Sequence, residues 1–179
     1  MSLLDFLGLG PPQAEQEGAP TEADTIRKIV RALQEMEPER AKHLAAFAFI
    51  LSRVANADMQ ISDDEQRQME HSVMAWGGLP EEQAVLVVQI AINQNVLFGG
   101  TDNFIVTREF RDNSTRQQKE ELLHCLFAVS AADDSISSVE ENTIAQIARE
   151  LGLDHRDLVA IRAAYRDKRA VLKNLPRSG

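Results

Sequence analysis

The chain has 179 residues, of which 44% are hydrophobic and 26% charged, and its formal net charge is −9. This composition is typical of a folded domain, and the negative charge argues against a nucleic-acid partner, because phosphates attract basic surfaces. A single cysteine, Cys125, excludes an intrachain disulfide, and no run approaches the roughly 20 apolar residues of a membrane-spanning helix. Since the N-terminus also lacks a secretory signal pattern, we expect a cytoplasmic protein.

Residues 1–20 are expected to precede the folded domain. An apolar start, "MSLLDFLGLG", is followed by "PPQAEQEGAPTEAD", which is rich in proline, alanine and acidic residues and has no hydrophobic period. The second piece is typical of a flexible linker. The first can form one amphipathic turn that docks on a partner, on the domain itself or, least favourably, peripherally on a membrane, through Leu3, Leu4, Phe6 and Leu7. A frayed terminus is the alternative.

Helical periodicity predicts an all-α domain over residues 21–175, with seven or eight helices. The first carries an apolar stripe at helical spacing and ends before Pro38; the stripe consists of Ile26, Ile29, Val30 and Leu33. The second begins near Pro38 and contains an almost wholly apolar stretch, "LAAFAFILSRVANA". A helix that is apolar on every side is expected to lie at the centre of the fold.

The remaining helices are predicted from three kinds of signal, namely capping residues, prolines and pairs of adjacent glycines. They are 62–76, 80–98, 102–111 and three that open at Ser114, Ser137 and Asp154, the last continuing to about Leu172. The final helix is basic, whereas the rest of the chain is acidic, so it could offer a face to an anionic partner or simply be solvated.

One phrase occurs twice: "ANADMQISDDE" at residues 55–65 and "SAADDSISSVE" at residues 130–140. In each copy an apolar helix leads into a short acidic loop, and an amphipathic helix ended by glycine follows. The duplication predicts two helix-loop-helix pseudo-repeats, about 41–78 and 116–153, that pack about a pseudo-twofold axis. The identical pairs are Leu51 and Leu126, Val54 and Val129, Ala57 and Ala132, Asp58 and Asp133, Ile61 and Ile136, Ser62 and Ser137, Glu65 and Glu140, and Gly77 and Gly152.

The repeated serines and glutamates have a structural interpretation. Ser62 with Glu65, and Ser137 with Glu140, match the capping box, in which the serine accepts from the third backbone N–H and the glutamate accepts from the serine's N–H. This helix-capping role has the same weight as a ligand role for the two glutamates.

The repeated aspartates, Asp58 and Asp133, follow the C-terminal ends of apolar helices, where a negative charge faces the negative end of the helix dipole. An Asx-turn would offset this cost. A bound cation would offset it more fully, because carboxylates brought together from two loops repel each other. Oxygen ligands favour Ca²⁺ or Mg²⁺, whereas Zn²⁺ prefers His or Cys, which neither loop contains.

The phrase overlaps the second half of an EF-hand loop, but an ordinary EF-hand is excluded. Its opening acidic position would fall on Val54 or Val129. We keep one feature of that loop as a prediction, namely that Ile61 and Ile136 pair their backbones and hold the two loops side by side. Packing of both isoleucines in the core is the alternative.

The segments "RVANADMQISDDE" and "AVSAADDSISSVE", with their flanking helices, resemble the two halves of the TerB-like tellurite-resistance family, whose pattern is A-x-A-D-G-x-I-x-x-x-E. The resemblance covers about residues 41–165. It implies an all-helical fold with neighbouring acidic loops, and a role in bacterial tellurite and stress responses. It also implies a divalent-cation site formed by Asp58, Glu65, Asp133 and Glu140. Where the family has glycine, this chain has Met59 and Asp134.

No catalytic signature accompanies these features. The histidines occupy four different predicted helices without ligand spacing: His43, His71, His124 and His155. His124 and Cys125 lie in an apolar helix and are expected to be a buried pair. We therefore expect a non-enzymatic, cation-binding TerB-like module that contacts a protein partner in a stress response. The alternatives are a metal-independent structural adaptor and a metal-assisted hydrolase.

Overall fold

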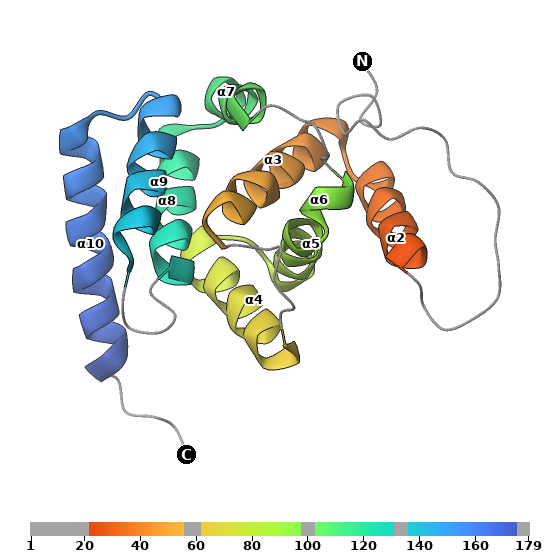
Figure 1. Ribbon diagram of the computed structural model, residues 1–179, viewed down its shortest axis with the longest axis horizontal. Coiled ribbons are helices and arrows are strands. Elements are labelled where there is room, and N and C mark those ends of the chain that lie inside the picture. Colours follow the sequence, from red (N-terminus) through yellow and green to blue (C-terminus); the bar gives the residue numbers. More distant parts are fainter. Residues whose placement is uncertain (1–21, 56–61, 98–102, 131–135, 175–179) are drawn as a thin grey trace.

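The computed structural model describes residues 22–55, 62–97, 103–130 and 136–174, which form nine helices and contain no strand (Figure 1). The all-α prediction is confirmed. Because α6 is a single turn directly after α5, the number of longer helices agrees with the expected seven or eight. In chain order the helices are α2 (Glu22–Glu35), α3 (Pro38–Ala55), α4 (Asp63–Gly77), α5 (Glu81–Ile92), α6 (Gln94–Leu97), α7 (Asn103–Asn113), α8 (Arg116–Ser130), α9 (Ser138–Glu150) and α10 (His155–Asn174).

Helix α3 lies at the centre of the fold, as its apolar sequence predicts (Figure 1). It packs against α2, α5, α7, α8 and α9. Phe47, Ile50 and Leu51 are fully buried along it. A helix with neighbours on all sides can bury apolar residues around its whole circumference, so this segment needs no polar face.

The other helices complete one hydrophobic core around α3 and α8. Helix α4 packs against α8 and α5, while α9 packs against α3, α7 and α8. Helix α10 lies at the edge of the molecule and contacts α8 and α9 (Figure 1). It presents Leu158, Ile161 and Tyr165 to the core, so its remaining faces meet solvent.

Two predicted helix ends depend on glycine. Gly78, at φ 68°, ends α4, and Gly152, at φ 78°, follows α9. Both values lie in the left-handed region, which side chains with a Cβ adopt at a cost. At Gly78 a Cβ would also lie 3.1 Å from the carboxyl group of Glu121.

The predicted helix 80–98 is divided in two, which corrects the sequence interpretation. Helix α5 ends at Ile92 and α6 begins at Gln94. Between them, the Nδ2 of Asn93 donates to the Gln89 carbonyl at 2.8 Å. An asparagine side chain that bonds the carbonyl four residues earlier competes with the helical backbone pattern.

The start of α8 also differs from the prediction by one residue. Thr115, rather than Ser114, makes the capping box: its Oγ1 accepts from the N–H of Gln118 at 3.1 Å, and its N–H donates to Gln118 Oε1 at 2.8 Å. Ser114 Oγ instead lies 3.5 Å from Nδ1 of His43. Since Gln117 and Gln118 are both glutamine, the sequence fits a cap at either hydroxyl.

Candidate functional site

The second half of each repeated phrase has the same local geometry in both copies. Ser62 caps α4 and Ser137 caps α9, with backbone angles of −69°, 160° and −70°, 157°. The N–H of Ser62 donates to Glu65 Oε2 at 2.8 Å, and the N–H of Ser137 donates to Glu140 Oε2 at 2.7 Å. The return bonds to the serine hydroxyls measure 3.3 and 3.2 Å. Both capping boxes predicted from the sequence are present.

Each capping glutamate uses one carboxylate oxygen in this arrangement. The Oε2 of Glu65 also accepts from the Ser62 hydroxyl at 2.8 Å, whereas no described residue donates to Oε1 of Glu65 or of Glu140. The backbone hydrogen bond from Ser62, followed by its hydroxyl bond, lowers the pKa of Glu65. A carboxylate has lone pairs on both oxygens, so capping leaves one oxygen of each glutamate for another ligand.

Of the other residues in the predicted site, only Ile136 lies within the described part of the chain. Asp58, Asp133 and Ile61 lie outside the described residues. Ile136 is half-buried and packs against the core. Within the described ranges, no group of three or more His, Cys, Asp or Glu side chains is placed to hold a metal. The four-carboxylate cation site and the pairing of the isoleucines therefore stay predictions.

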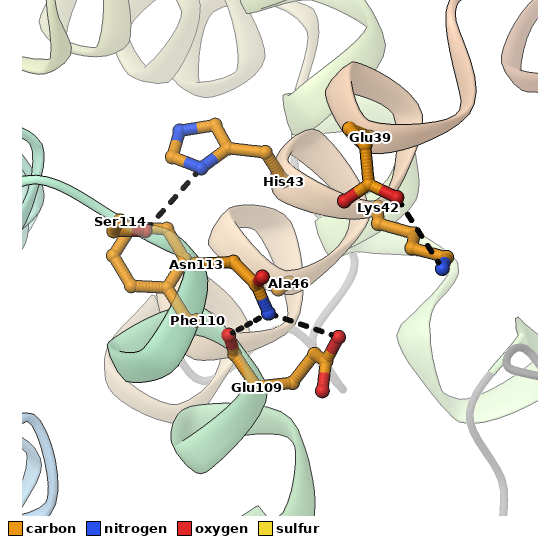
Figure 2. Close-up of a pocket in the computed structure, with 8 residues that line it drawn as sticks. All are labelled: Glu39, Lys42, His43, Ala46, Glu109, Phe110, Asn113 and Ser114. Carbon is orange, nitrogen blue, oxygen red and sulfur yellow. Dashed lines mark hydrogen bonds and ion pairs between the residues drawn. The ribbon is translucent and has the colours of Figure 1, made fainter.

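A pocket of about 90 Å³ lies between α3 and α7, and none of the residues that line it belongs to a repeated phrase (Figure 2). Its buried floor includes Ala46 and Phe110. Charged and amide side chains form two local pairs around it: Lys42 Nζ lies 3.8 Å from Glu39, and Asn113 Nδ2 donates to the Glu109 carboxylate at 3.1 Å. The sequence analysis did not predict this pocket, because the two helices that line it are distant in the chain.

His43 is the most perturbed side chain of the pocket. Its ring stacks on Phe110 with 4.9 Å between centroids, and its Nδ1 faces Ser114 (Figure 2). Burial, and secondarily the positive charge of Arg40, lowers the pKa of His43 to about 4. The imidazole is therefore neutral at pH 7, where it can both donate and accept one hydrogen bond.

A nearly buried ion pair joins α3 to α9 and is hydrogen-bonded to α7. Arg53 donates to both oxygens of Glu150, at 2.7 and 3.2 Å, and to Thr107 Oγ1 at 3.0 Å. Burial raises the pKa of Glu150, but the hydrogen bonds and charge of Arg53, with bonds from Thr107 and Gln146, outweigh it and lower the pKa overall. The sequence analysis missed this network. The available signal was a charged Arg53 inside an otherwise apolar helix, because a buried charge needs a partner.

The histidines and the cysteine do not assemble into a nucleophilic site among the described residues. His43, His71, His124 and His155 lie on four different helices, as the sequence predicts. Cys125 is fully buried, and burial raises the pKa of its thiol to about 12. The thiol is therefore protonated at neutral pH and unreactive as a nucleophile.

The family model described as "Tellurite resistance protein TerB" matches residues 44–163. The chain belongs to the TerB family. The match includes both repeated phrases and runs from α3 into α10. TerB membership, which confirms the resemblance seen in the sequence, points to a role related to tellurite resistance. Searches for matching curated proteins and for matching solved structures found neither.

The folded part of the chain begins before the region that the TerB family model matches. Helix α2 lies before the matched region, yet its Ile29 and Leu33 are buried in the common core. In this TerB protein, α2 packs against α3 and α5. None of the described helices is both long and apolar enough to cross a membrane.

Proposed function

We propose that this TerB protein is a divalent-cation-binding module that contacts a protein partner in a stress response of the tellurite-resistance type. The cation ligands are Asp58, Glu65, Asp133 and Glu140, and Ca²⁺ or Mg²⁺ is preferred over Zn²⁺ because all four are oxygen ligands. The doubled acidic phrase carries this proposal. Its support from the fold is that Glu65 and Glu140 occupy equivalent positions at the starts of α4 and α9.

The free carboxylate oxygens fit this role. One oxygen of Glu65 and one of Glu140 is engaged by the helix cap, which fixes the orientation of each carboxylate. The second oxygen of each remains for a cation. A carboxylate that is already held by hydrogen bonds loses less conformational entropy when it binds a ligand.

Helix packing supports a pseudo-twofold relation between the repeats. The second helix of each repeat packs against the first helix of the other: α4 against α8, and α9 against α3. The two first helices, α3 and α8, also contact each other. Reciprocal contacts of this kind favour an arrangement in which corresponding loops of the two repeats face one another.

Calorimetric titration of the metal-free protein with Ca²⁺, Mg²⁺, Mn²⁺ and Zn²⁺ tests the proposal. We expect saturable binding of Ca²⁺ or Mg²⁺ by the parent and its loss in Asp58→Asn/Asp133→Asn. The matched control is Asp63→Asn/Asp64→Asn, which removes the same charge from exposed first-turn positions of α4. Equal loss in the control would reduce the effect to general electrostatic attraction, and no binding by the parent would refute the cation site.

A metal-independent adaptor is the second candidate, and the capping boxes favour it. Capping alone accounts for the type and spacing of Ser62, Glu65, Ser137 and Glu140. In that case partner contact would rest on the apolar N-terminal segment or on the basic α10. A metal-assisted hydrolase is the third candidate, and the pocket between α3 and α7 contains none of the four proposed ligands.

A further inference from the structure

The pocket between α3 and α7 has an apolar and aromatic floor. Ala46 and Phe110 are buried there, and the ring of His43 stacks on that of Phe110. Burial lowers the pKa of His43 to about 4, so this ring carries no charge at pH 7. A floor of this kind suits the hydrocarbon part of a ligand.

The α3 wall of the pocket supplies a cation that keeps its hydrogen-bonding capacity. The Nζ of Lys42 lies 3.8 Å from a carboxylate oxygen of Glu39, which is beyond hydrogen-bonding distance. The Glu39 side chain is 68% exposed, so water screens the pair, whereas Lys42 is only 26% exposed. Lys42 therefore retains ammonium donors for an anionic group of a ligand.

The α7 wall supplies acceptors (Figure 2). The Nδ2 of Asn113 donates to the Glu109 carbonyl at 3.0 Å and to Glu109 Oε1 at 3.1 Å. These bonds use both amide donors of Asn113 and orient the Glu109 carboxylate. They leave Oδ1 of Asn113 and Oε2 of Glu109 as acceptors, and a ligand ammonium is the group that donates to such a pair.

The charges of the two walls select among ligand classes. Glu39, His43 and Glu109 line the pocket, but no three His, Cys, Asp or Glu side chains in the described part of the chain are placed to hold a metal. A simple amine would be repelled by Lys42, and a simple carboxylate would be repelled by the two glutamates. A zwitterion can place each of its charges beside an opposite one.

The volume of the pocket limits the size of the ligand. One water needs about 10–15 Å³ of such a cavity, so the 90 Å³ between α3 and α7 admits about six to nine non-hydrogen atoms. Amino acids with short apolar side chains, such as valine, are of this size.

We propose that this pocket binds a small zwitterionic amino acid with an apolar side chain. The ammonium group is held by Glu109 and Asn113, the carboxylate by Lys42, and the side chain packs on the floor. This inference is independent of the proposed cation site, because none of the four proposed cation ligands lines the pocket. Its tests are made in EDTA, so the outcome for one site does not decide the other.

NMR titration of the full chain with L-valine tests the proposal. We expect saturable shifts of the His43 ring and of the Phe110 and Asn113 amide signals, with a dissociation constant in the millimolar range that is usual for so small a ligand. Isobutylamine and isovalerate, which each lack one charged group of valine, should bind at least tenfold more weakly. Absence of these shifts, shifts confined to other helices, or equal binding of either analogue would overturn the proposal.

Two variants test the assignment of the charged groups. Lys42→Gln should abolish the preference for valine over isobutylamine, and Glu109→Gln should abolish the preference over isovalerate. The matched controls are Lys28→Gln on α2 and Glu82→Gln on α5, which make the same changes at exposed positions and should keep both preferences. Damage to the fold would weaken all three ligands together, so a change in preference reports the contact itself. Unchanged preferences in Lys42→Gln and Glu109→Gln would refute the assigned contacts.

Discussion

At the scale of single residues, His43 shows how burial sets a protonation state. Its pKa of about 4 lies below the ordinary value of 6.5, so the unfolded chain binds the proton more tightly than the folded one. Stability from neutral His43 is therefore complete above about pH 6.5 and is lost as the pH falls toward 4. The full shift corresponds to about 3 kcal/mol, which solvent screening at this partly exposed ring reduces to about 2 kcal/mol.

When the pH falls from 6.5 to 4, we expect the free energy of unfolding of His43→Gln to fall by about 2 kcal/mol less than that of the parent. Urea unfolding at both pH values measures the difference directly. His155→Gln is the matched control, because it makes the same chemical change at an exposed position on α10. If His43→Gln and the parent lose the same free energy over this range, protonation of His43 does not contribute to acid destabilisation.

The Arg53–Glu150 pair gives a second prediction at this scale. Both side chains are nearly buried, with 10% and 13% exposure. Glu150→Gln would leave the guanidinium of Arg53 without its counter-charge in a place where little water reaches it. We expect a loss of about 3 kcal/mol in the free energy of unfolding, measured by urea denaturation at pH 7.

The exposed pair of Arg67 and Asp64 serves as the control, since its side chains are 76% and 95% exposed. Asp64→Asn makes the same chemical change, carboxylate to amide, and should cost less than about 1 kcal/mol. If Glu150→Gln costs no more than Asp64→Asn in the free energy of unfolding, then water or neighbouring side chains compensate the charge of Arg53.

At the scale of helices, the repeated serines determine where α4 and α9 begin. Ser62→Ala and Ser137→Ala each remove an acceptor for the third backbone N–H, and we expect each to cost about 0.5–2 kcal/mol in urea unfolding. Ser138→Ala, in the first turn of α9 but outside the capping box, should cost clearly less. Equal effects of Ser137→Ala and Ser138→Ala would argue that the cap contributes little to stability.

Helix positions were predictable because local signals define them. Apolar periodicity, Pro38 and Gly78 act on residues within a few positions of themselves, so α2, α3 and α4 are found where the sequence places them. The two errors, at Asn93 and at Ser114, also have local causes. In each case two conformations were compatible with the sequence, and side-chain hydrogen bonds in the folded chain selected one.

The site was less predictable because side-chain convergence is not local. The capping half of each phrase, Ser62 with Glu65 and Ser137 with Glu140, followed from spacing alone. The contact of Arg53 with Glu150 spans 97 residues and depends on how α9 packs against α3. The hydrophobic periodicity of α3 or of α9 does not specify this contact. Periodicity likewise does not specify how α3 and α7 come together to form the pocket around His43.

At the scale of the whole molecule, cation binding should appear as stabilisation against heat. The chain carries a net charge of −9, so carboxylates repel one another in the folded state, and unfolding relieves this repulsion. A bound cation would neutralise part of the repulsion and so favour the folded state. A ligand that binds only the folded state at 100 times its dissociation constant adds about 2.7 kcal/mol. For a domain of this size we expect Ca²⁺ or Mg²⁺ to raise Tm by about 5–10 °C.

The variant Asp58→Asn/Glu65→Gln/Asp133→Asn/Glu140→Gln should lose this rise. Its Tm without metal will also differ from that of the parent, because Glu65 and Glu140 cap helices and because four charges are removed. The informative quantity is therefore the change in Tm on adding cation, measured for each protein against its own metal-free state. Since capping does not require a cation, a metal-independent adaptor predicts no rise in either protein. An equal rise in both would locate cation binding elsewhere on the acidic surface and would refute the four-carboxylate site.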